Sequence, residues 1–181
     1  PAYEDAIAIR SSSNVYNQSL LASIVAHNGV EAARQWAAGV VENMARDPQG
    51  GDRDQIRAIA AGEADYAVVN TYYIGQMLNS TDPQERAVAE QIDVFFPNQE
   101  GRGTHVNVSG AGVTRYARNR ENAIRLLEFL VNDQSQAAFA QANYEYPVVE
   151  GVELADSIAA WGEFQEDDLD LSLLAEYNRE A

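Results

Sequence analysis

Gly62-Glu-Ala-Asp-Tyr-Ala-Val-Val-Asn-Thr-Tyr-Tyr-Ile-Gly75 is the stretch that decides the fold. Its middle, Asp65–Val69, is a short apolar run that predicts a buried strand. Asn70 or Thr71 can then cap a short helix that reaches Asn79. Because short strands alternate with helices along the rest of the chain as well, the sequence predicts an α/β fold.

Tyr72 and Tyr73 stand side by side where this predicted strand ends. Adjacent phenols would be unusual core residues here, because a buried ring keeps clear of loops and its hydroxyl needs a partner. They can instead direct their oxygens at one point in front of the sheet edge, where ligands bind in open α/β sheets. A hard trivalent cation prefers anionic oxygen ligands, so it would suit such a point.

A third tyrosine follows another predicted strand. Ala6–Ile9 indicates a short buried strand, and Tyr16 comes soon after it, at the start of a helix predicted over Val15–His27. If both strands lie in one parallel sheet, Tyr16 shares a sheet edge with Tyr72 and Tyr73. Three phenolates would neutralise a trivalent ion, although each phenol must first lose a proton with a free pKa of about 10. The alternative is that Tyr16 is only a partly buried helix residue.

The polar loop before this helix is a candidate anion site. Backbone amides at the start of a helix can hold a small anion such as carbonate or phosphate. Ser11 and Asn14 lie in this loop, and the guanidinium of Arg10 can assist them. Asn70 is a further candidate for a contact with the anion or with the tyrosines. The alternative is an ordinary helix cap beside a surface arginine.

Composition restricts the classes of partner. The chain of 181 residues has a net charge of −16, and all 12 of its basic residues are arginine. Such a charge repels nucleic acid, so we expect no nucleic-acid partner. It is typical of an acidic surface suited to high salt, and it would also attract cations. Without cysteine, the chain has neither disulfides nor a thiol nucleophile.

No motif indicates an enzyme. His27 falls in the last turn of a helix, where a structural role is expected, and His105 follows a glycine turn. The acidic run Glu166–Asp168 is interpreted as a solvated linker, with divalent-cation chelation as the alternative. No G-x-S-x-G sequence, Walker loop or dinucleotide-binding loop is present. A hydrolase with paired carboxylates and a purely structural module remain as weaker alternatives.

Further predicted elements continue the α/β alternation. Asp52 can cap a helix that runs to about Ala61. The period of the apolar residues predicts further helices over 30–46, 82–91, 119–132, 133–143, 156–161 and 169–179, and further strands over Val94–Phe96 and His105–Val108.

Several of these stretches are similar to the periplasmic ferric-ion-binding proteins, the solute receptors of bacterial iron(III) ABC importers. The similar stretches follow the family order through most of the chain: Ile9–Ser19, Gly51–Asp65, Asn70–Tyr73, Phe96–Gly112 and Asn143–Pro147. In this family the tandem tyrosines bind iron, and one branch adds a third tyrosine in an Asn-x-Tyr-Asn motif. The resemblance assigns these roles to Tyr72, Tyr73 and Tyr16.

The resemblance implies a periplasmic-binding-protein lobe of type II, with a mixed sheet and helices on both faces, in an incomplete two-lobe protein. Residues 1–103 would form the carboxyl-terminal lobe. Residues 104–150 would hold a crossover strand and helices that pack on the absent amino-terminal lobe, and 151–181 a tail that returns. The absent lobe would supply the remaining iron ligands of the family.

The function implied is iron(III) capture and delivery to an inner-membrane ABC permease, from the periplasm or from a membrane-tethered position. Iron would bind with carbonate or another small anion, and the half-built site would bind weakly, so an iron-free state is expected. Residues 119–143 would lose apolar cover and could self-associate. The alternative function is a receptor for another oxyanion or a small organic solute that the tyrosines contact directly.

Overall fold

The computed structural model describes residues 3–179 and 181, and its chain forms two compact units. Unit 1 comprises Pro1–Asn107 and Phe164–Ala181, and unit 2 comprises Val108–Glu163. All the candidate site residues lie in unit 1, so the site can be described within that unit alone.

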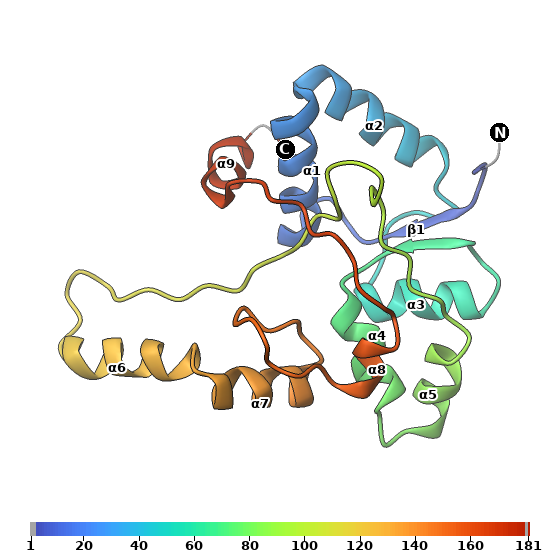
Figure 1. The fold of residues 1–181 in the computed structure, drawn as a ribbon. Coiled ribbons are helices and arrows are strands. Elements are labelled where there is room, and N and C mark those ends of the chain that lie inside the picture. The colour runs from blue at the N-terminus through green and yellow to red at the C-terminus, as the bar shows by residue number, and fades with distance from the viewer. Residues whose placement is uncertain (1–2, 180) are drawn as a thin grey trace. The chain divides into compact units, whose positions relative to one another are not determined.

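A pair of parallel strands forms the centre of unit 1. Strand β1 is Ile7–Ile9 and strand β2 is Tyr66–Val68, and Ile7 pairs with Tyr66 while Ile9 pairs with Val68. The predicted strands before the tyrosines are thus confirmed, and they are parallel neighbours. Their carboxyl ends therefore lie level at one edge of the sheet (Figure 1).

The sheet is smaller than predicted. In the described part of the chain it has these strands alone, so the expected mixed sheet is not formed. Neither Val94–Phe96 nor His105–Val108 is a strand, and Thr104 makes only an isolated bridge with Glu166. A strand is stable only beside another strand that satisfies its backbone groups. The apolar run Val94–Phe96 and the alternation in His105–Val108 therefore gave wrong predictions, and Phe95 is 84% exposed.

Helices lie on both sides of this strand pair. The helices of unit 1 are α1 (Val15–Asn28), α2 (Val30–Glu42), α3 (Asp52–Ala60), α4 (Thr71–Leu78), α5 (Pro83–Ala89) and α9 (Leu171–Tyr177). Helices α1 and α2 lie on one side of the strands, while α3, α4 and α5 lie on the other (Figure 1). Helix α9 packs against α1. The tail that carries α9 thus belongs to the same unit as the strands.

Small apolar side chains pack the part of the core next to the strands. Ala8 of β1 packs with Ala58 of α3 and with Ala64 before β2. A second cluster joins α1 and α2 through Ile24 and Ala33. Alanine lets backbone segments approach closely, so α3 lies directly against both strands.

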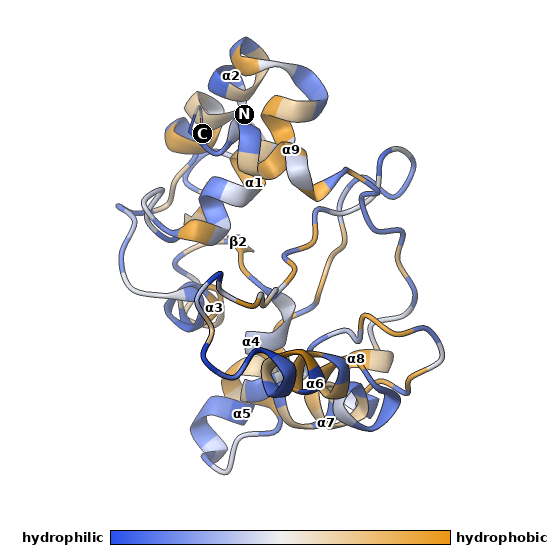
Figure 2. Cartoon of the chain, turned by 90° about the vertical axis from the view of Figure 1, so that its left-hand side faces the viewer, coloured by the Kyte–Doolittle hydropathy of each residue, from blue (hydrophilic) through white to orange (hydrophobic). Residues whose placement is uncertain are grey.

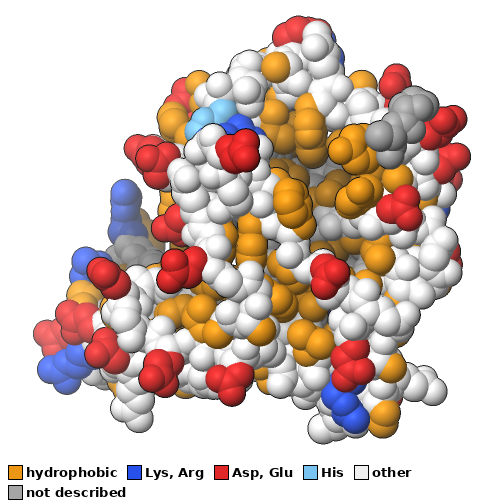
Figure 3. All heavy atoms as spheres, turned by 45° about the vertical axis from the view of Figure 1, so that its right-hand side comes forward, with side chains coloured by type: hydrophobic (Ala, Val, Ile, Leu, Met, Phe, Trp, Pro, Cys, Tyr) orange, Lys and Arg blue, Asp and Glu red, His pale blue; other side chains and the backbone are white. Residues whose placement is uncertain are grey.

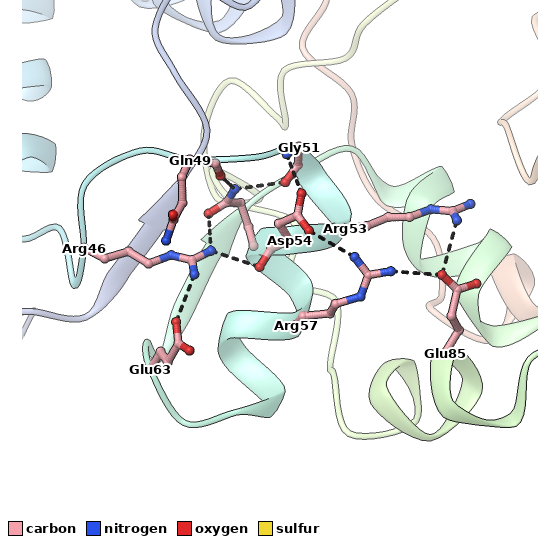
Figure 4. Close-up of polar contacts among 9 residues, drawn as sticks. Arg46, Gln49, Gly51, Arg53, Asp54, Arg57, Glu63 and Glu85 are labelled. Carbon is pink, nitrogen blue, oxygen red and sulfur yellow. Dashed lines mark hydrogen bonds and ion pairs between the residues drawn. The ribbon is translucent and has the colours of Figure 1, made fainter.

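Ion pairs hold α3 to its neighbours. Arg57 bonds both Asp54 on its own helix (3.1 Å) and Glu85 on α5 (3.0 Å), as Figure 4 shows. The helix begins at Asp52 with Gly51 as its N-cap, so the prediction that Asp52 caps the helix is wrong. The side chain of Asp52 is therefore available for contacts outside its own helix.

Unit 2 contains α6 (Arg120–Leu130), α7 (Asp133–Asn143) and the short helix α8 (Asp156–Ala159). No residue of α6 is buried, and Leu126 and Phe129 are 55% and 53% exposed. Figure 2 colours much of α6 and α7 as hydrophobic. A shallow groove of about 390 Å³ runs between these helices, lined largely by apolar residues. Apolar side chains on this unit therefore lack a cover within the described chain.

On the face drawn in Figure 3, acidic side chains outnumber basic ones. This distribution agrees with the net charge of −16. Across residues 3–179 and 181, no helix is long and apolar enough to cross a membrane.

Candidate metal centre

The first turn of α1 positions Tyr16. Asn14 is the N-cap of this helix, and its Oδ1 accepts a hydrogen bond from the backbone N–H of Tyr16 (2.9 Å). Asn17 donates from Nδ2 to the carbonyl oxygen of Arg10 (2.7 Å), which ties the helix to the end of β1. The loop and the helix start are thus joined by local hydrogen bonds, and the half-buried ring of Tyr16 is held close to the sheet edge.

The first turn of α4 positions the tandem tyrosines in the same way. Asn70 is the N-cap of α4, so Tyr72 and Tyr73 are its second and third residues. Their ring centroids lie 4.3 Å apart at an interplanar angle of 32°. Both rings are half-buried, while the following Ile74 is buried in the core and anchors the turn.

The two helix starts bring their phenols together. The hydroxyl oxygens of Tyr16 and Tyr72 lie 3.0 Å apart and form a hydrogen bond. This contact joins residues 56 positions apart in the sequence. The structure therefore brings Tyr16, Tyr72 and Tyr73 into one cluster at the carboxyl edge of the strand pair.

The hydroxyl of Tyr72 is held in its neutral form. Burial, together with hydrogen bonds to Tyr16 and Tyr73, raises the pKa of Tyr72 well above its ordinary value. The positive N-terminal ends of α1 and α4 act in the opposite sense, because they favour negative charge on nearby groups. A cation that displaces the phenolic protons would therefore gain anionic oxygens without needing carboxylates.

Arg10 lies beside the phenols. Its guanidinium carbon is 5.7 Å from the centroid of the Tyr16 ring, and its Nη1 forms an ion pair with Oδ2 of Asp52. Burial lowers the pKa of Arg10, but Asp52 and then Tyr73 raise it, and the net direction is upward. Arg10 therefore remains a fixed positive charge next to the cluster.

Asp52 and Asn107 are polar residues of this region that the sequence did not single out for the site. Asp52 contacts Arg10, and its Oδ1 accepts from the backbone N–H of Asn70 (3.0 Å). Asn107 donates from Nδ2 to Oδ1 of Asn70 (2.8 Å). The signal for Asp52 was its place in the Gly51–Asp65 stretch, where it was interpreted as a helix cap.

The remaining predicted residues lie nearby with different partners. Asn14 and Asn70 are the N-cap residues of α1 and α4, two positions before Tyr16 and Tyr72, and the side chain of Asn14 makes a capping hydrogen bond while that of Asn70 does not. Ser11 is exposed, and its hydroxyl bonds that of Ser13 (2.9 Å) within its own loop. Ser11 therefore serves this loop in the structure, and Arg10 is the charged candidate nearest the phenols.

The histidines belong to another part of unit 1. Nε2 of His27 contacts the carboxylate of Asp167 (2.9 Å), as expected for a structural histidine, and Nε2 of His105 bonds the hydroxyl of Ser19 (3.1 Å). No group of His, Cys, Asp and Glu in residues 3–179 and 181 is arranged to hold a metal ion. The phenol cluster is therefore the candidate metal centre.

Sequence comparison identifies related proteins over nearly the whole chain. Residues 1–166 match the family described as bacterial extracellular solute-binding protein. The chain is 55% identical over 174 residues to iron uptake protein A1 of Synechocystis, covering 96% of this chain and 48% of the relative. It is 26% identical over 148 residues to the major ferric iron-binding protein of Neisseria meningitidis, covering 82% of this chain and 43% of the relative.

Solved structures agree with these matches. A ferric binding protein from Campylobacter jejuni superposes with a TM-score of 0.95 at 42% identity, over 99% of this chain and 57% of that one. A Trichodesmium protein in complex with iron and citrate gives 0.95 at 46% identity, again over 99% of this chain and 57% of that one. These neighbours confirm the predicted fold class, a partial periplasmic-binding-protein lobe.

The match covers most of this chain but only part of each relative. The chain spans about half the length of the curated relatives it matches. The match nonetheless covers most of this chain and carries high identity. The chain therefore belongs to the family of bacterial extracellular solute-binding proteins, which are transport components and not enzymes, as the sequence predicted.

Proposed function

We propose that this chain binds iron(III) through the phenolate oxygens of Tyr16, Tyr72 and Tyr73 as part of an iron importer. The observation that carries the proposal is the 3.0 Å contact between the hydroxyls of Tyr16 and Tyr72 beside the ring of Tyr73. A hard trivalent cation prefers anionic oxygen ligands, and three phenolates balance its charge. The names of the Synechocystis and Neisseria relatives, which concern iron uptake and ferric iron, support this choice of solute.

A small anion completes the coordination in this proposal. Arg10 supplies a positive charge beside Tyr16, and the helix starts capped by Asn14 and Asn70 supply backbone N–H groups. Ser11 lies in the same loop and remains a weaker candidate. The Trichodesmium neighbour was solved with iron and citrate, which supports a carboxylate-type or carbonate anion here. These residues would orient the anion and leave the tyrosines to bind the metal.

A second lobe completes the site. The relatives and structural neighbours are about twice as long as the matched region, which supports further ligands from the uncovered half. In this proposal residues 1–103 form the carboxyl-terminal lobe, 104–150 pack on the other lobe, and 151–181 return. The uncovered apolar side chains of α6 in unit 2 support such a packing role. The chain alone would then bind iron more weakly than the two-lobe protein.

We propose that the whole protein delivers iron to an inner-membrane ABC permease, and membership of a solute-binding family supports this role. The family description places such proteins outside the cytoplasm, and we propose a periplasmic or membrane-tethered position for this one. The acidic surface would keep cations near the protein and nucleic acid away from it.

Equilibrium dialysis of the chain against iron(III) citrate tests the proposal. We expect one iron(III) bound per chain, and little binding of zinc(II) under the same conditions, because phenolates favour the harder ion. Tyr66→Phe serves as the control for tyrosine substitution and should still bind iron(III), since Tyr66 is an exposed tyrosine of β2 outside the cluster. The alternative function, a receptor for another oxyanion or an organic solute, predicts that the chain retains citrate equally well without iron.

A further inference from the structure

Asp52 is a buried carboxylate that connects two loops of the phenol site. The residue is only 3% exposed, although an ionised carboxylate is costly to bury. Its Oδ2 forms an ion pair with Nη1 of Arg10, and its Oδ1 accepts from the backbone N–H of Asn70 at 3.0 Å. Both oxygens are thus used, and each bonds a different loop.

The bond to Arg10 reaches Tyr16. Arg10 follows the last residue of β1, and its guanidinium lies over the Tyr16 ring at 5.7 Å from the centroid. Its carbonyl oxygen accepts the hydrogen bond of Asn17 in the first turn of α1 (2.7 Å). The side chain of Arg10 therefore contacts Tyr16, and its backbone is hydrogen-bonded to the same helix turn.

The bond to Asn70 reaches the tandem tyrosines. Asn70 is the N-cap of α4, and its own side chain makes no capping bond, because its Oδ1 accepts from Asn107 instead. The direction of the first turn of α4 therefore depends on how the Asn70 backbone is held. Asp52 holds its N–H, and Tyr72 and Tyr73 follow within that turn.

The position of Asp52 is not explained by the stability of its own helix. Asp54, and not Asp52, bonds the N-cap backbone of α3, from Oδ2 to the N–H of Gly51 (2.8 Å). The strand pairing ends at Ile9 and Val68, before either loop begins. Asp52 thus joins the two loops beyond the sheet, in addition to the hydrogen bond between the Tyr16 and Tyr72 hydroxyls.

We propose that Asp52 is a positioning residue that sets the spacing between the Tyr16 phenol and the Tyr72 and Tyr73 phenols. The inference rests on the proposed function for its effect on iron, but the spacing itself is a property of the metal-free chain. Removal of groups that orient metal ligands typically lowers metal affinity by about 10–100-fold, and we expect the same range here.

The first test compares Asp52→Asn with the wild-type chain in an iron(III) titration from a weak chelate. We expect the affinity to fall by about 10–100-fold and the visible phenolate-to-iron band to shift, since its position reports ligand geometry. The matched control is Asp54→Asn on the same helix, where the carboxylate bonds Arg57 and the Gly51 N–H. An unchanged band and affinity in folded Asp52→Asn would overturn the proposal.

The second measurement needs no iron and reports the spacing directly. Ruthenium-sensitised photo-oxidation couples tyrosines that lie in contact, and cleavage at arginine places Tyr16 in peptide 11–34 and Tyr72 and Tyr73 in peptide 58–86. All chains in this experiment carry Tyr66→Phe, because Tyr66 shares peptide 58–86 and contacts Tyr3. We expect a cross-link between the two peptides in the chain that carries Tyr66→Phe alone and in the chain that also carries Asp54→Asn. The yield should be severalfold lower in the chain that also carries Asp52→Asn. Equal yields would overturn the proposal even if the chain binds no iron.

A double variant, Arg10→Gln with Asp52→Asn, addresses the case in which Asp52→Asn does not fold. It removes the buried carboxylate and the partly exposed guanidinium that pairs with it, so no charge is left unpaired. It also keeps an oxygen at position 52 that can accept from the backbone N–H of Asn70. Glutamine at position 10 is too short to reach from position 52 to the Tyr16 ring as arginine does, so we expect a low cross-link yield. Because the variant has no arginine at position 10, the peptide that carries Tyr16 begins before residue 11. Unchanged yield and affinity in the double variant would overturn the proposal, because Asp52 would then only balance charge. If the wild type shows no visible band on iron addition but the cross-link yields follow the expected pattern, the iron function is contradicted and the positioning role of Asp52 is not.

Discussion

The hydroxyl of Tyr16 lies 3.0 Å from the hydroxyl of Tyr72, across 56 positions of sequence. The contact exists because β1 and β2 are parallel and level, and because each strand is followed by a capped helix start. The same arrangement places Arg10 beside Tyr16. Iron(III) affinity at such a site would depend on the chemistry of the tyrosines and on the positions of the two loops that carry them.

Tyr72→Phe should abolish most iron(III) binding. The variant removes one anionic ligand and leaves the Tyr16 hydroxyl without its partner. Loss of an orienting contact alone typically costs about 10–100-fold in metal affinity, so loss of a ligand should cost about 100-fold or more. Competition with citrate measures the difference. Binding within a few fold of the wild type would show that Tyr72 is no ligand.

The same variant should change folding stability only slightly. One hydrogen bond between partly exposed groups contributes about 1 kcal/mol, and the ring of Tyr72 is retained against Tyr73. Urea unfolding measures this directly. Tyr66→Phe is the control for both experiments, because this exposed tyrosine packs edge-on against Tyr3 outside the cluster.

Iron(III) affinity should rise with pH. The raised pKa of Tyr72 means that the free site holds its proton throughout the neutral range, and phenolate binding releases that proton. Higher pH therefore favours the bound state. Calorimetry in buffers of different ionisation enthalpy counts the protons released, and we expect at least one per iron. Binding without proton release would contradict coordination by phenolates.

The same pKa gives a prediction for the iron-free chain. The folded state holds the Tyr72 proton more tightly than the unfolded state, whose tyrosines titrate near pH ~10. This contribution to stability is fully present below that pH and is lost as the pH rises above it. In Tyr72→Phe the loss of stability above pH ~10 should be smaller than in the wild type.

His105 should make the chain less stable in mild acid. Burial is the main influence and lowers the pKa of His105; Asp167 opposes it, while Arg102 and His27 act with it. The unfolded state, with a histidine pKa of about 6.5, therefore binds more protons near that pH than the folded state does. Stability from this residue is present above pH ~6.5 and is lost as the pH falls below it.

Urea unfolding at neutral pH and in mild acid checks this expectation with two variants. His105→Gln should reduce the difference between the two conditions, because the amide keeps a polar group near Ser19 but does not titrate. Ser19→Ala is the control: it loses one hydrogen bond, about 1 kcal/mol, at both pH values and keeps the difference. An undiminished pH difference in His105→Gln would contradict the assignment.

Leu126→Gln should reduce self-association of the chain with little effect on its stability. Leu126 is 55% exposed on α6, and exposed substitutions usually change the free energy of unfolding by less than about 0.5 kcal/mol. An apolar face without cover favours association of copies. Sedimentation velocity compares the variant with the wild type and with Arg125→Gln on the same helix. A wild-type chain that stays monomeric at high concentration would contradict the self-association expected from the sequence for residues 119–143.

The sequence predicted the elements that hold the tyrosines better than it predicted the sheet. Both strands before the tyrosines and the helices after them were recognisable, because capping residues and apolar runs are local signals. The strands predicted over Val94–Phe96 and His105–Val108 were not formed, since pairing depends on a partner strand and not on alternation within the segment.

Asp52 shows a second limit of sequence reasoning. Its place before a helical period indicated a cap, but the structure starts the helix at Asp52 and turns its side chain to Arg10 and Asn70. No local pattern reveals these contacts, because Arg10 is 42 positions and Asn70 is 18 positions away from Asp52 in the sequence. By contrast, Tyr16, Tyr72 and Tyr73 could be selected because all of them follow predicted strands.

Titration of the chain with iron(III) from a weak chelate, followed in visible light, tests the central claim most directly. The proposed coordination predicts a broad phenolate-to-iron charge-transfer band in the wild type that disappears in Tyr72→Phe/Tyr73→Phe and persists in Tyr66→Phe. Bound iron without that band, or a band of equal strength in the double variant, would contradict it.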